Sequence, residues 1–322
     1  MPSDDDFTPL HIARAAPLAE GIHGYELQRP DAGELPAFTP GAHIEVRVPN
    51  GMVRKYSLAN DPAERDRYLI VVKREVGGRG GSASLVDHAR TGDLLPAHLP
   101  PRNDFPLAER AQQYVFLAGG IGITPIMSMV RHLKSAGGPR FKLYYLNRSP
   151  AVAAFREELS APELRGQAML HYDGGDPARA FDLWTLLERP VPGTHVYCCG
   201  PRPLLEAVRD MSGHWSPAAI HFESFVDAAA THTAEDRPFR VRLAQSGEVI
   251  EVGKNDTILE ALRARGHDVP SSCESGTCGT CRTTLLAGEA DHRDFVLTDD
   301  EQATNIMVCI SRARSDEIVI DR

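Results

Sequence analysis

The sequence predicts a multidomain protein of the β and α/β classes, in which three structural patterns follow one another along 322 residues. Short alternating strands with turns fill the first hundred residues, which is typical of an antiparallel β-barrel. Strands and helices then alternate, which predicts a parallel α/β sheet. A β-hairpin, a helix and a group of cysteines make up the last part. Because the chain is about two or three times as long as a typical domain, we expect more than one hydrophobic core.

The barrel pattern is clearest in "GAHIEVRVPNGMVRKYSLAND", where Ile44, Val46 and Val48 alternate with other residues before an Asn-Gly turn. A buried strand, "RYLIVVKRE", follows, and "GGRGGSASLVDHA" leads through a glycine and serine loop into a helix. An arginine, a tyrosine and a hydroxyl at one strand end, together with a Gly-Gly-Ser turn, could hold a flavin phosphate. Each piece also has a simpler interpretation, since Tyr56 fits a core aromatic residue and Gly78–Ser82 fits a mobile loop.

The middle of the chain begins with "QQYVFLAGGIGITPIMSMVRHLKSAGG", which predicts a strand, a glycine turn and an amphipathic helix. We expect Thr124 to cap this helix and Gly137 to end it. The bare amides at such a helix start bind phosphate. Gly120 and Gly122 form part of a dinucleotide-binding motif, but Pro125 stands where its third glycine belongs. A glycine turn that merely ends a core strand is the alternative.

Two further strand ends support a nucleotide-binding sheet. "FKLYYLNRS" predicts a buried strand, and "HVYCCGPRPLLEAVRDM" predicts a strand, a Cys-Gly-Pro turn and a helix. Ligands of parallel sheets bind at the carboxyl ends of the strands. Cys198 and Cys199 point to opposite sides of their strand, so at most one of them faces a ligand. Both also fit small core residues.

Four cysteines form the strongest motif. Cys273, Cys278 and Cys281 lie in "SSCESGTCGTCR", and Cys309 stands alone further on. Disulfides, zinc and an iron–sulfur cluster are the alternatives, and a reducing compartment disfavours disulfides. Structural zinc commonly takes two similar cysteine pairs. The observed C-x4-C-x2-C…C spacing is that of plant-type [2Fe–2S] clusters, which it favours over zinc.

The surroundings of these cysteines resemble a plant-type ferredoxin, a β-grasp fold, across residues 236–322. "FRVRLAQSGEVIEV" predicts a hairpin, and "DTILEALRARG" predicts a helix with Asp256 as its N-cap and Gly266 at its end. The preceding "DAAATHTAEDRP" is polar and has no apolar periodicity, which indicates a linker. Because a ferredoxin passes one electron at a time, we expect the rest of the chain to contain its electron source.

Composition excludes several other classes. The net charge of −9 disfavours a general nucleic-acid binder, which needs a basic face. No apolar run approaches the roughly 20 residues of a membrane-spanning helix. The first residues are acidic and have no apolar core, unlike a secretory signal peptide. We expect a cytoplasmic protein that binds neither nucleic acid nor a membrane.

Taken together, the motifs R-x-Y-S, "GGRGGS", "GGIGITP", "HVYCCGP", "GHWSP", "IHFESF" and "SSCESGTCG" resemble those of the phthalate dioxygenase reductase family across nearly the whole chain. The resemblance implies three cofactors: FMN, NADH and a [2Fe–2S] cluster. It also implies an order of domains. An FMN-binding β-barrel is expected at 1–107, an NAD-binding α/β domain at 108–226, a linker at 227–235 and a [2Fe–2S] ferredoxin domain at 236–322.

The resemblance assigns roles to individual residues. FMN is expected to contact Arg54, Lys55, Tyr56, Ser57 and Lys73, and its phosphate is expected at Gly80, Gly81, Ser82 and Ser84. The nicotinamide pocket is expected at Gly120, Gly122, Cys199, Gly200 and Pro201, with Thr124 and Phe225 near the flavin. At the ribose position the chain departs from the family, because Ser149 replaces an acidic residue and Arg148 lies beside it. Since arginine can accept a 2′-phosphate, this departure weakens the case for strict NADH use, although NADH remains the expected donor.

The expected function follows from this order of cofactors. NADH supplies electrons in pairs and a [2Fe–2S] centre accepts one at a time, so a flavin belongs between them. The resemblance implies that the cluster reduces a Rieske-type aromatic-ring dioxygenase. The alternatives are a reductase for a related Rieske O-demethylase or monooxygenase, and a stand-alone NAD(P)H oxidase or flavin reductase. A redox sensor is a further alternative, but a sensor needs no hydride path and a stand-alone oxidase needs no ferredoxin domain.

Overall fold

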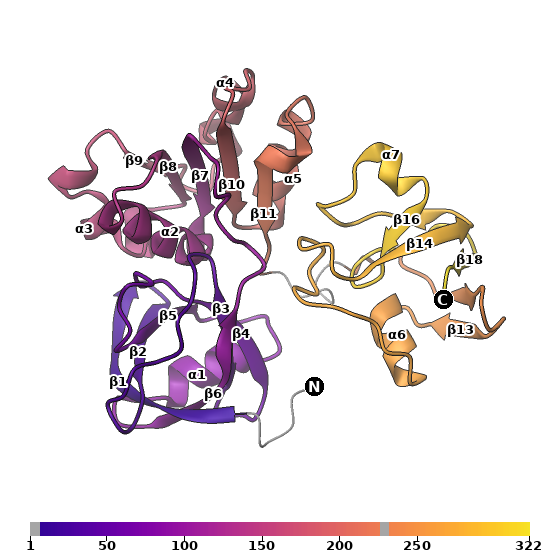
Figure 1. The fold of residues 1–322 in the computed structure, drawn as a ribbon, viewed down its shortest axis with the longest axis horizontal. Coiled ribbons are helices and arrows are strands. Elements are labelled where there is room, and N and C mark those ends of the chain that lie inside the picture. Colours follow the sequence, from indigo (N-terminus) through magenta and orange to yellow (C-terminus); the bar gives the residue numbers. More distant parts are fainter. Residues whose placement is uncertain (1–6, 226–231) are drawn as a thin grey trace. The chain divides into compact units, whose positions relative to one another are not determined.

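The structure, a computed structural model, describes residues 7–225 and 232–322. The chain divides into two compact units, residues 1–221 and 222–322. The first unit contains an antiparallel barrel and a parallel α/β sheet, and the second contains a small mixed sheet with two helices (Figure 1). The predicted fold class is therefore confirmed. In the described part of the chain, no helix combines the length and the apolar character needed to span a membrane.

The barrel consists of six antiparallel strands in the order β4-β3-β6-β1-β2-β5. The strands are β1 (Phe7–Ala19), β2 (Ile22–Gln28), β3 (His43–Arg47), β4 (Val53–Ser57), β5 (Tyr68–Lys73) and β6 (Leu94–Arg102). An antiparallel bridge between Leu58 and Ile70 joins the two ends of this order, so the sheet closes on itself. The predicted apolar side chains of Ile44, Val46 and Val48 are all buried in the barrel core.

A single helix, α1 (Gly81–His88), follows β5 and packs on the barrel through the buried Leu85. Gly80 precedes it with a φ of 85°, a left-handed conformation that favours glycine. The predicted glycine and serine loop therefore ends directly at a helix N-terminus.

The parallel sheet has the order β11-β10-β7-β8-β9. Its strands are β7 (Gln113–Gly119), β8 (Arg140–Asn147), β9 (Ala168–Tyr172), β10 (Thr194–Cys199) and β11 (Ile220–Glu223). Its helices are α2 (Ile123–Ser135), α3 (Arg156–Leu159), α4 (Leu183–Leu187) and α5 (Arg202–Met211). The chain leaves β7 toward β8 and later returns to β10 on the other side of β7. In open α/β sheets, ligands bind at such a reversal of strand order.

The start of α2 differs from the sequence-based expectation. Its N-cap is Gly122, which has no side chain to cap with, because a short 3₁₀ turn at Gly120–Gly122 runs directly into the helix. Thr124 lies in the first turn instead and donates its hydroxyl to the Ile121 carbonyl at 3.1 Å. The predicted end is confirmed, since the helix stops at Ser135 and Gly137 has a φ of 65°.

The second unit contains a five-stranded mixed sheet in the order β13-β12-β18-β14-β16, with a separate β15–β17 pair. The strands are β12 (Phe239–Leu243), β13 (Val249–Val252), β14 (Arg282–Ala287), β15 (Ala290–Asp291), β16 (Asn305–Met307), β17 (Arg312–Ala313) and β18 (Glu317–Ile320). The helices are α6 (Ile258–Ala264) and α7 (Asp299–Gln302). The predicted hairpin and helix are present, but the N-cap of α6 is Thr257 rather than Asp256. Thr257 forms a reciprocal capping box with Glu260, which satisfies two backbone amides at once.

Candidate functional site

Strand β4 and the start of α1 bring Arg54 and Gly81, two of the predicted flavin residues, together. The Arg54 side chain lies against Gly81, where an added Cβ would be only 2.6 Å from the arginine Nε. Glycine at this position therefore lets the guanidinium approach the helix N-terminus. Asn50 donates to the Gly80 carbonyl at 3.3 Å and helps to fix the turn. An open hollow of about 540 Å³ lies beside it, lined in part by Asn50, Gly80 and Ser84.

Three hydroxyls of predicted flavin residues support a bound FMN. The hydroxyls of Tyr56, Ser57 and Ser84 are buried and have no hydrogen-bond partner among the described residues. Buried polar groups in proteins almost always have partners, so these three hydroxyls fit a polar ligand such as FMN. Burial also raises the pKa of the Tyr56 phenol, which keeps it a hydrogen-bond donor. Free amides at the start of α1 and the Arg54 cation suit a phosphate.

Replacing Ser84 with Ala tests this assignment. If its hydroxyl binds the phosphate, the Kd for FMN rises about tenfold, the loss expected for one hydrogen bond to a charged group. Fluorescence titration of the apoprotein with FMN measures it. Ser246→Ala, in the β12–β13 turn of the other unit, is the control and leaves the Kd unchanged. An unchanged FMN affinity in Ser84→Ala would contradict the assignment.

Three other predicted flavin residues have partners of their own. The Lys73 ammonium is 2.7 Å from a Glu75 carboxylate oxygen, and the Ser82 hydroxyl accepts a hydrogen bond from the Glu75 amide at 3.1 Å. Lys55 is exposed, and its Nζ is 3.9 Å from a Glu45 carboxylate oxygen. Their contribution to FMN binding stays a prediction.

The two glycine turns at the reversal of strand order touch through their backbones. An added Cβ on Gly122 would lie 2.1 Å from the Cys199 carbonyl oxygen, and one on Gly200 would lie 3.0 Å from the Gly119 Cα. Pro201 packs on the same place, 2.7 Å from the Cβ position of Gly119. The predicted nicotinamide residues of β7–α2 and β10–α5 thus form one continuous surface.

The cysteines beside these turns are core residues. Cys198 and Cys199 are both fully buried, and burial raises the pKa of the Cys198 thiol. The Cys199 side chain belongs to the apolar cluster of the first unit, and its carbonyl faces Gly122. A thiol in such surroundings is unreactive, so we infer that Cys199 contributes mainly through its backbone.

The carboxyl ends of β8 and β9 meet around Arg148. The Gly174 amide donates to the Arg148 carbonyl at 2.9 Å, and the Asp173 amide donates to the Asn147 carbonyl at 3.2 Å. Asp173 also accepts a hydrogen bond from the Gly175 amide at 2.7 Å. The sequence analysis missed Asp173, although an acidic residue directly after a strand could have indicated it. It places a carboxylate at the carboxyl ends of β8 and β9, the edge at which ligands of such sheets generally bind.

The four cysteines of the second unit come from two segments. Cys281 and Cys309 are buried, while Cys273 and Cys278 are partly exposed, and all four are free thiols. Among the described residues, no group of three or more His, Cys, Asp or Glu side chains is arranged to hold a single metal ion. A [2Fe–2S] cluster holds two irons, so the loop that carries three of the four cysteines must suit the cluster as a whole.

The cysteine loop has the backbone conformation and donors that a cluster needs. Gly276 and Gly279 have φ values of 76° and 84°, so the chain curls with few side chains in the way. The amides of Ser275 and Thr277 donate to the Cys273 sulfur, each at 3.4 Å. Contact with the neighbouring cysteines, aided by these amides, lowers the pKa of the Cys273 thiol. Thiolate ligands with amide donors are the set that iron–sulfur clusters use, so the residues fit the group.

One acidic residue missed by the sequence analysis holds both cysteine segments. The Asp294 side chain is completely buried and accepts hydrogen bonds from the Leu297 amide at 2.8 Å and the Ser311 hydroxyl at 3.4 Å. Ser311 lies two residues after Cys309. A Cβ added to Gly276 would be 3.1 Å from the Asp294 Cα, so the loop also rests against this residue. A lone acid outside any motif gives no sequence signal.

Phe225, predicted to lie near the flavin, is 45% exposed. It follows β11 and belongs to the second unit, at the end of the first described segment. Its place beside the nicotinamide stays a prediction. The predicted linker, 227–235, lies partly outside the described residues.

The comparisons with known proteins agree with this geometry. Residues 116–210 match the oxidoreductase NAD-binding domain family, and residues 241–314 match the 2Fe-2S iron-sulfur cluster binding domain family. The chain is 54% identical over 319 residues to the phthalate 4,5-dioxygenase oxygenase reductase subunit of Pseudomonas putida, covering 99% of this chain and 98% of that protein. It is 52% identical over 320 residues to phthalate dioxygenase reductase of Burkholderia cepacia, covering 99% of each.

A solved structure is similar over the same length. It is that of a phthalate dioxygenase reductase, described as a modular structure for electron transfer from pyridine nucleotides to [2Fe-2S]. The identity is 51%, the TM-score is 0.74, and 99% of each chain is covered.

The fold and these sites define a pyridine-nucleotide-dependent oxidoreductase that carries an iron–sulfur domain. The chain belongs to the phthalate dioxygenase reductase family. It is an electron-transfer reductase with FMN, NADH and a [2Fe–2S] cluster as its cofactors, so the resemblance, the activity and the cofactors predicted from the sequence are confirmed.

Proposed function

We propose that this chain is the reductase component of a phthalate-type aromatic-ring dioxygenase, and that it delivers electrons singly to a Rieske-type oxygenase. The observation that carries this proposal is the end-to-end identity of 54% and 52% to two reductases of phthalate dioxygenases. Both identities extend over the barrel, the parallel sheet and the cysteine domain. A cytoplasmic location is part of the proposal, because NADH is supplied there.

Within this function, the chain's own residues bind and orient the cofactors. We infer that Arg54, Tyr56, Ser57 and Ser84 hold the flavin, because Arg54 lies against Gly81 at the start of α1 and the other three carry buried hydroxyls without partners among the described residues. FMN, when bound, accepts electrons in pairs and releases them one at a time. The turns at Gly120–Thr124 and Cys199–Pro201 shape the nicotinamide pocket and exclude side chains from it. Cys273, Cys278, Cys281 and Cys309 hold the cluster.

The proposed domain order keeps the boundaries given by the sequence: an FMN barrel at 1–107, an NAD domain at 108–226, a linker at 227–235 and a ferredoxin domain at 236–322. Support for the last boundary comes from Asp236. Its carboxylate accepts hydrogen bonds from Arg293 at 2.6 and 3.0 Å, which ties the first residue of the ferredoxin domain to the segment before the acidic helix α7. The pKa of Asp236 is lowered mainly by this contact.

The nucleotide preference is predicted to favour NADH. The Asp173 carboxylate can accept hydrogen bonds from a ribose and repels a 2′-phosphate, whereas Arg148 attracts one. Backbone hydrogen bonds fix Asp173, and Arg148 stands beside Ser149, which occupies the position of the family's acidic residue. We therefore expect kcat/KM for NADH to exceed that for NADPH about tenfold, or roughly 1.4 kcal/mol. Asp173→Asn should narrow this ratio and Arg148→Leu should widen it. Steady-state assays with both nucleotides measure it, and a preference for NADPH in the unaltered protein would refute the prediction.

Reconstitution tests the proposed partner. The purified reductase is combined under NADH with oxygenases that act on phthalate, on vanillate and on other aromatic acids, and product formation is compared with cytochrome c reduction. Turnover with a phthalate-type oxygenase, at least tenfold above the others, supports the proposal. Preference for a vanillate-type demethylase would make the chain the reductase of a Rieske O-demethylase. A vanillate O-demethylase oxidoreductase that is 39% identical to this chain is the reason to include that oxygenase. Rapid oxidation of NADH by oxygen alone would instead indicate a stand-alone oxidase.

A further inference from the structure

The guanidinium of Arg131 joins three segments of the first unit. Arg131 lies on α2, and its Nη1 donates to the Ala59 carbonyl of the barrel at 2.7 Å. Its Nε and Nη2 donate to the two carboxylate oxygens of Glu158 on α3, at 2.9 and 2.5 Å. The cation also lies 5.1 Å above the ring of Phe155. The side chain is 19% exposed, so these contacts are partly shielded from water.

Two of these segments carry residues of the proposed cofactor sites, and the third follows the strand that ends beside one. Ala59 follows Ser57 by two residues, and its amide donates to the Leu69 carbonyl at 2.8 Å. The next residue, Asn60, is fully buried and accepts a hydrogen bond from the Leu69 amide. The end of the flavin strand is thus rigid, and a displacement of Ala59 would move Ser57 with it.

The helix that carries Arg131 is equally rigid. Ile123–Val130, the first two turns of α2, is buried throughout, and the turn that precedes it contains Gly122. A shift at Arg131 therefore moves the start of the helix, where Thr124 lies. Glu158 belongs to the segment after β8, which ends at Asn147 beside the proposed ribose site.

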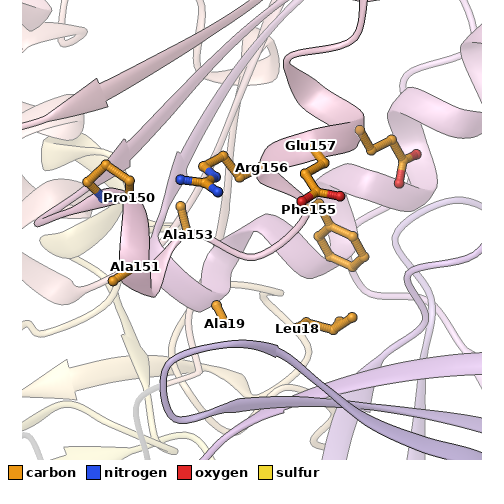
Figure 2. A pocket seen from close by; sticks show the side chains of 9 residues that line it. Leu18, Ala19, Pro150, Ala151, Ala153, Phe155, Arg156 and Glu157 are labelled. Atoms are coloured by element: carbon orange, nitrogen blue, oxygen red, sulfur yellow. The ribbon is translucent and has the colours of Figure 1, made fainter.

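Apolar packing leaves a gap at this junction. Ala59, Leu69 and Val71 of the barrel share a core with Met129 and other residues of the α/β sheet. Beside that core lies a hollow of about 390 Å³, with Leu18 and Ala19 of the β1–β2 hairpin on one side and residues 150–158 on the other. Figure 2 shows Phe155 facing Leu18 across it. Because apolar contact is incomplete at this edge, the hydrogen bonds of Arg131 add to the shared core in fixing the spacing of the two halves.

Phe155 gives independent support. Its φ of 56° lies in the left-handed region, which is rare for a bulky side chain. Such outliers persist where surrounding contacts enforce them, and they often mark functional positions. Here the strained backbone places the ring beneath Arg131 and starts α3 so that Glu158 reaches the guanidinium.

We propose that Arg131 is a positioning residue for hydride transfer: it sets the distance between the flavin strand and the helix that begins at the nicotinamide turn. The inference rests on the proposed flavin and nicotinamide sites. Arg131 is not one of the residues proposed to bind a cofactor, and it acts through Ala59 and through its own helix. A small displacement of reacting groups is enough to slow such a reaction strongly.

The test uses the full-length holoprotein with three variants. Arg131→Gln removes the charge and the paired hydrogen bonds to Glu158. Arg131→Lys retains the charge but has a single donor nitrogen in place of the three that Arg131 uses, and Glu158→Gln removes only the acid. Arg29→Lys is the matched control, because Arg29 makes a similar two-bond contact with Asp31 within a single surface loop. Stopped-flow absorbance gives the limiting rate of flavin reduction by NADH. Perturbation of the flavin spectrum by NAD⁺ reports nicotinamide stacking without turnover, and titration of the apoprotein gives the Kd for FMN.

We expect the limiting rate of flavin reduction to fall at least tenfold in Arg131→Gln and less in Arg131→Lys and Glu158→Gln. The NAD⁺-induced spectral change should shrink in the same order, while the Kd for FMN stays within threefold. Arg29→Lys should match the unaltered protein. If Arg131→Gln does not fold, the flavin reduction rates of Arg131→Lys and Glu158→Gln test the proposal. A lowered melting temperature with unchanged reduction rate and spectral change would overturn the proposal and leave Arg131 a stabilising residue only. Loss of FMN from the Arg131 and Glu158 variants would also overturn the proposal, because Arg131 would then support flavin binding and not the distance for hydride transfer.

Discussion

Cys309→Ser abolishes electron delivery to one-electron acceptors and leaves reduction of FMN by NADH within twofold of the unaltered rate. The reason is geometric. Cys309 is the one cluster ligand outside the cysteine loop, it is 1% exposed, and it contacts Cys273 and Cys281. A serine there cannot supply the fourth thiolate that the [2Fe–2S] spacing requires. The flavin and nucleotide residues other than Phe225 belong to the other unit, and the core of the cysteine domain is separate from the cores of that unit.

Iron and sulfide analysis, cytochrome c reduction and anaerobic flavin reduction measure this outcome. Cys198→Ala is the control, because Cys198 is buried in β10 of the first unit, outside the cysteine loop. It should retain its iron. If flavin reduction fell as far as cytochrome c reduction in Cys309→Ser, the division of the chain into separate electron-transfer modules would be wrong.

Gly122→Ala has the second largest expected effect, a loss of about 100-fold in kcat/KM for NADH. The new Cβ would lie 2.1 Å from the Cys199 carbonyl oxygen, 2.4 Å from the Cys199 carbonyl carbon and 2.7 Å from the Gly200 nitrogen. All three are backbone atoms, so no side chain can turn away. The two turns must separate, and the nicotinamide pocket between them widens.

Gly213→Ala is the matched control for this change. A Cβ at Gly213 would meet nothing within 4 Å in the part of the chain that the structure describes. Kinetics with NADH, together with FMN and iron content, measure both variants. Unchanged kinetics in Gly122→Ala, with normal cofactor content, would show that the turns do not shape the pocket.

The sequence predicted those features whose signal is local. The spacing of Cys273, Cys278 and Cys281 within one loop defines a ligand set without knowledge of the fold. The glycine turns before α2 and α5 were predictable for the same reason, because a strand, a turn and a helix follow one another directly. The helix caps were harder to predict. Thr257 rather than Asp256 caps α6, because Thr257 and Glu260 form reciprocal hydrogen bonds.

Contacts between distant segments could not be predicted. Asp294 joins two cysteine segments, and Arg131 joins the barrel to the sheet over a separation of 72 residues. Neither residue lies in a motif. The neighbouring sequence of a single acid or a single helical arginine does not reveal which distant segment the side chain contacts. Asp173 was missed because the ribose site was expected at Arg148 and Ser149, which follow β8, whereas Asp173 follows β9.

The backbone contact between the turns of Gly122 and Cys199 has an evolutionary consequence. Since the atoms nearest to Gly122 all belong to the main chain of the other turn, exposed side chains of α2 and α5 can change without altering this contact. Selection then acts most strongly on Gly122 and on the buried face of α2, while exposed positions of both helices are free to change as the protein adapts to new redox partners.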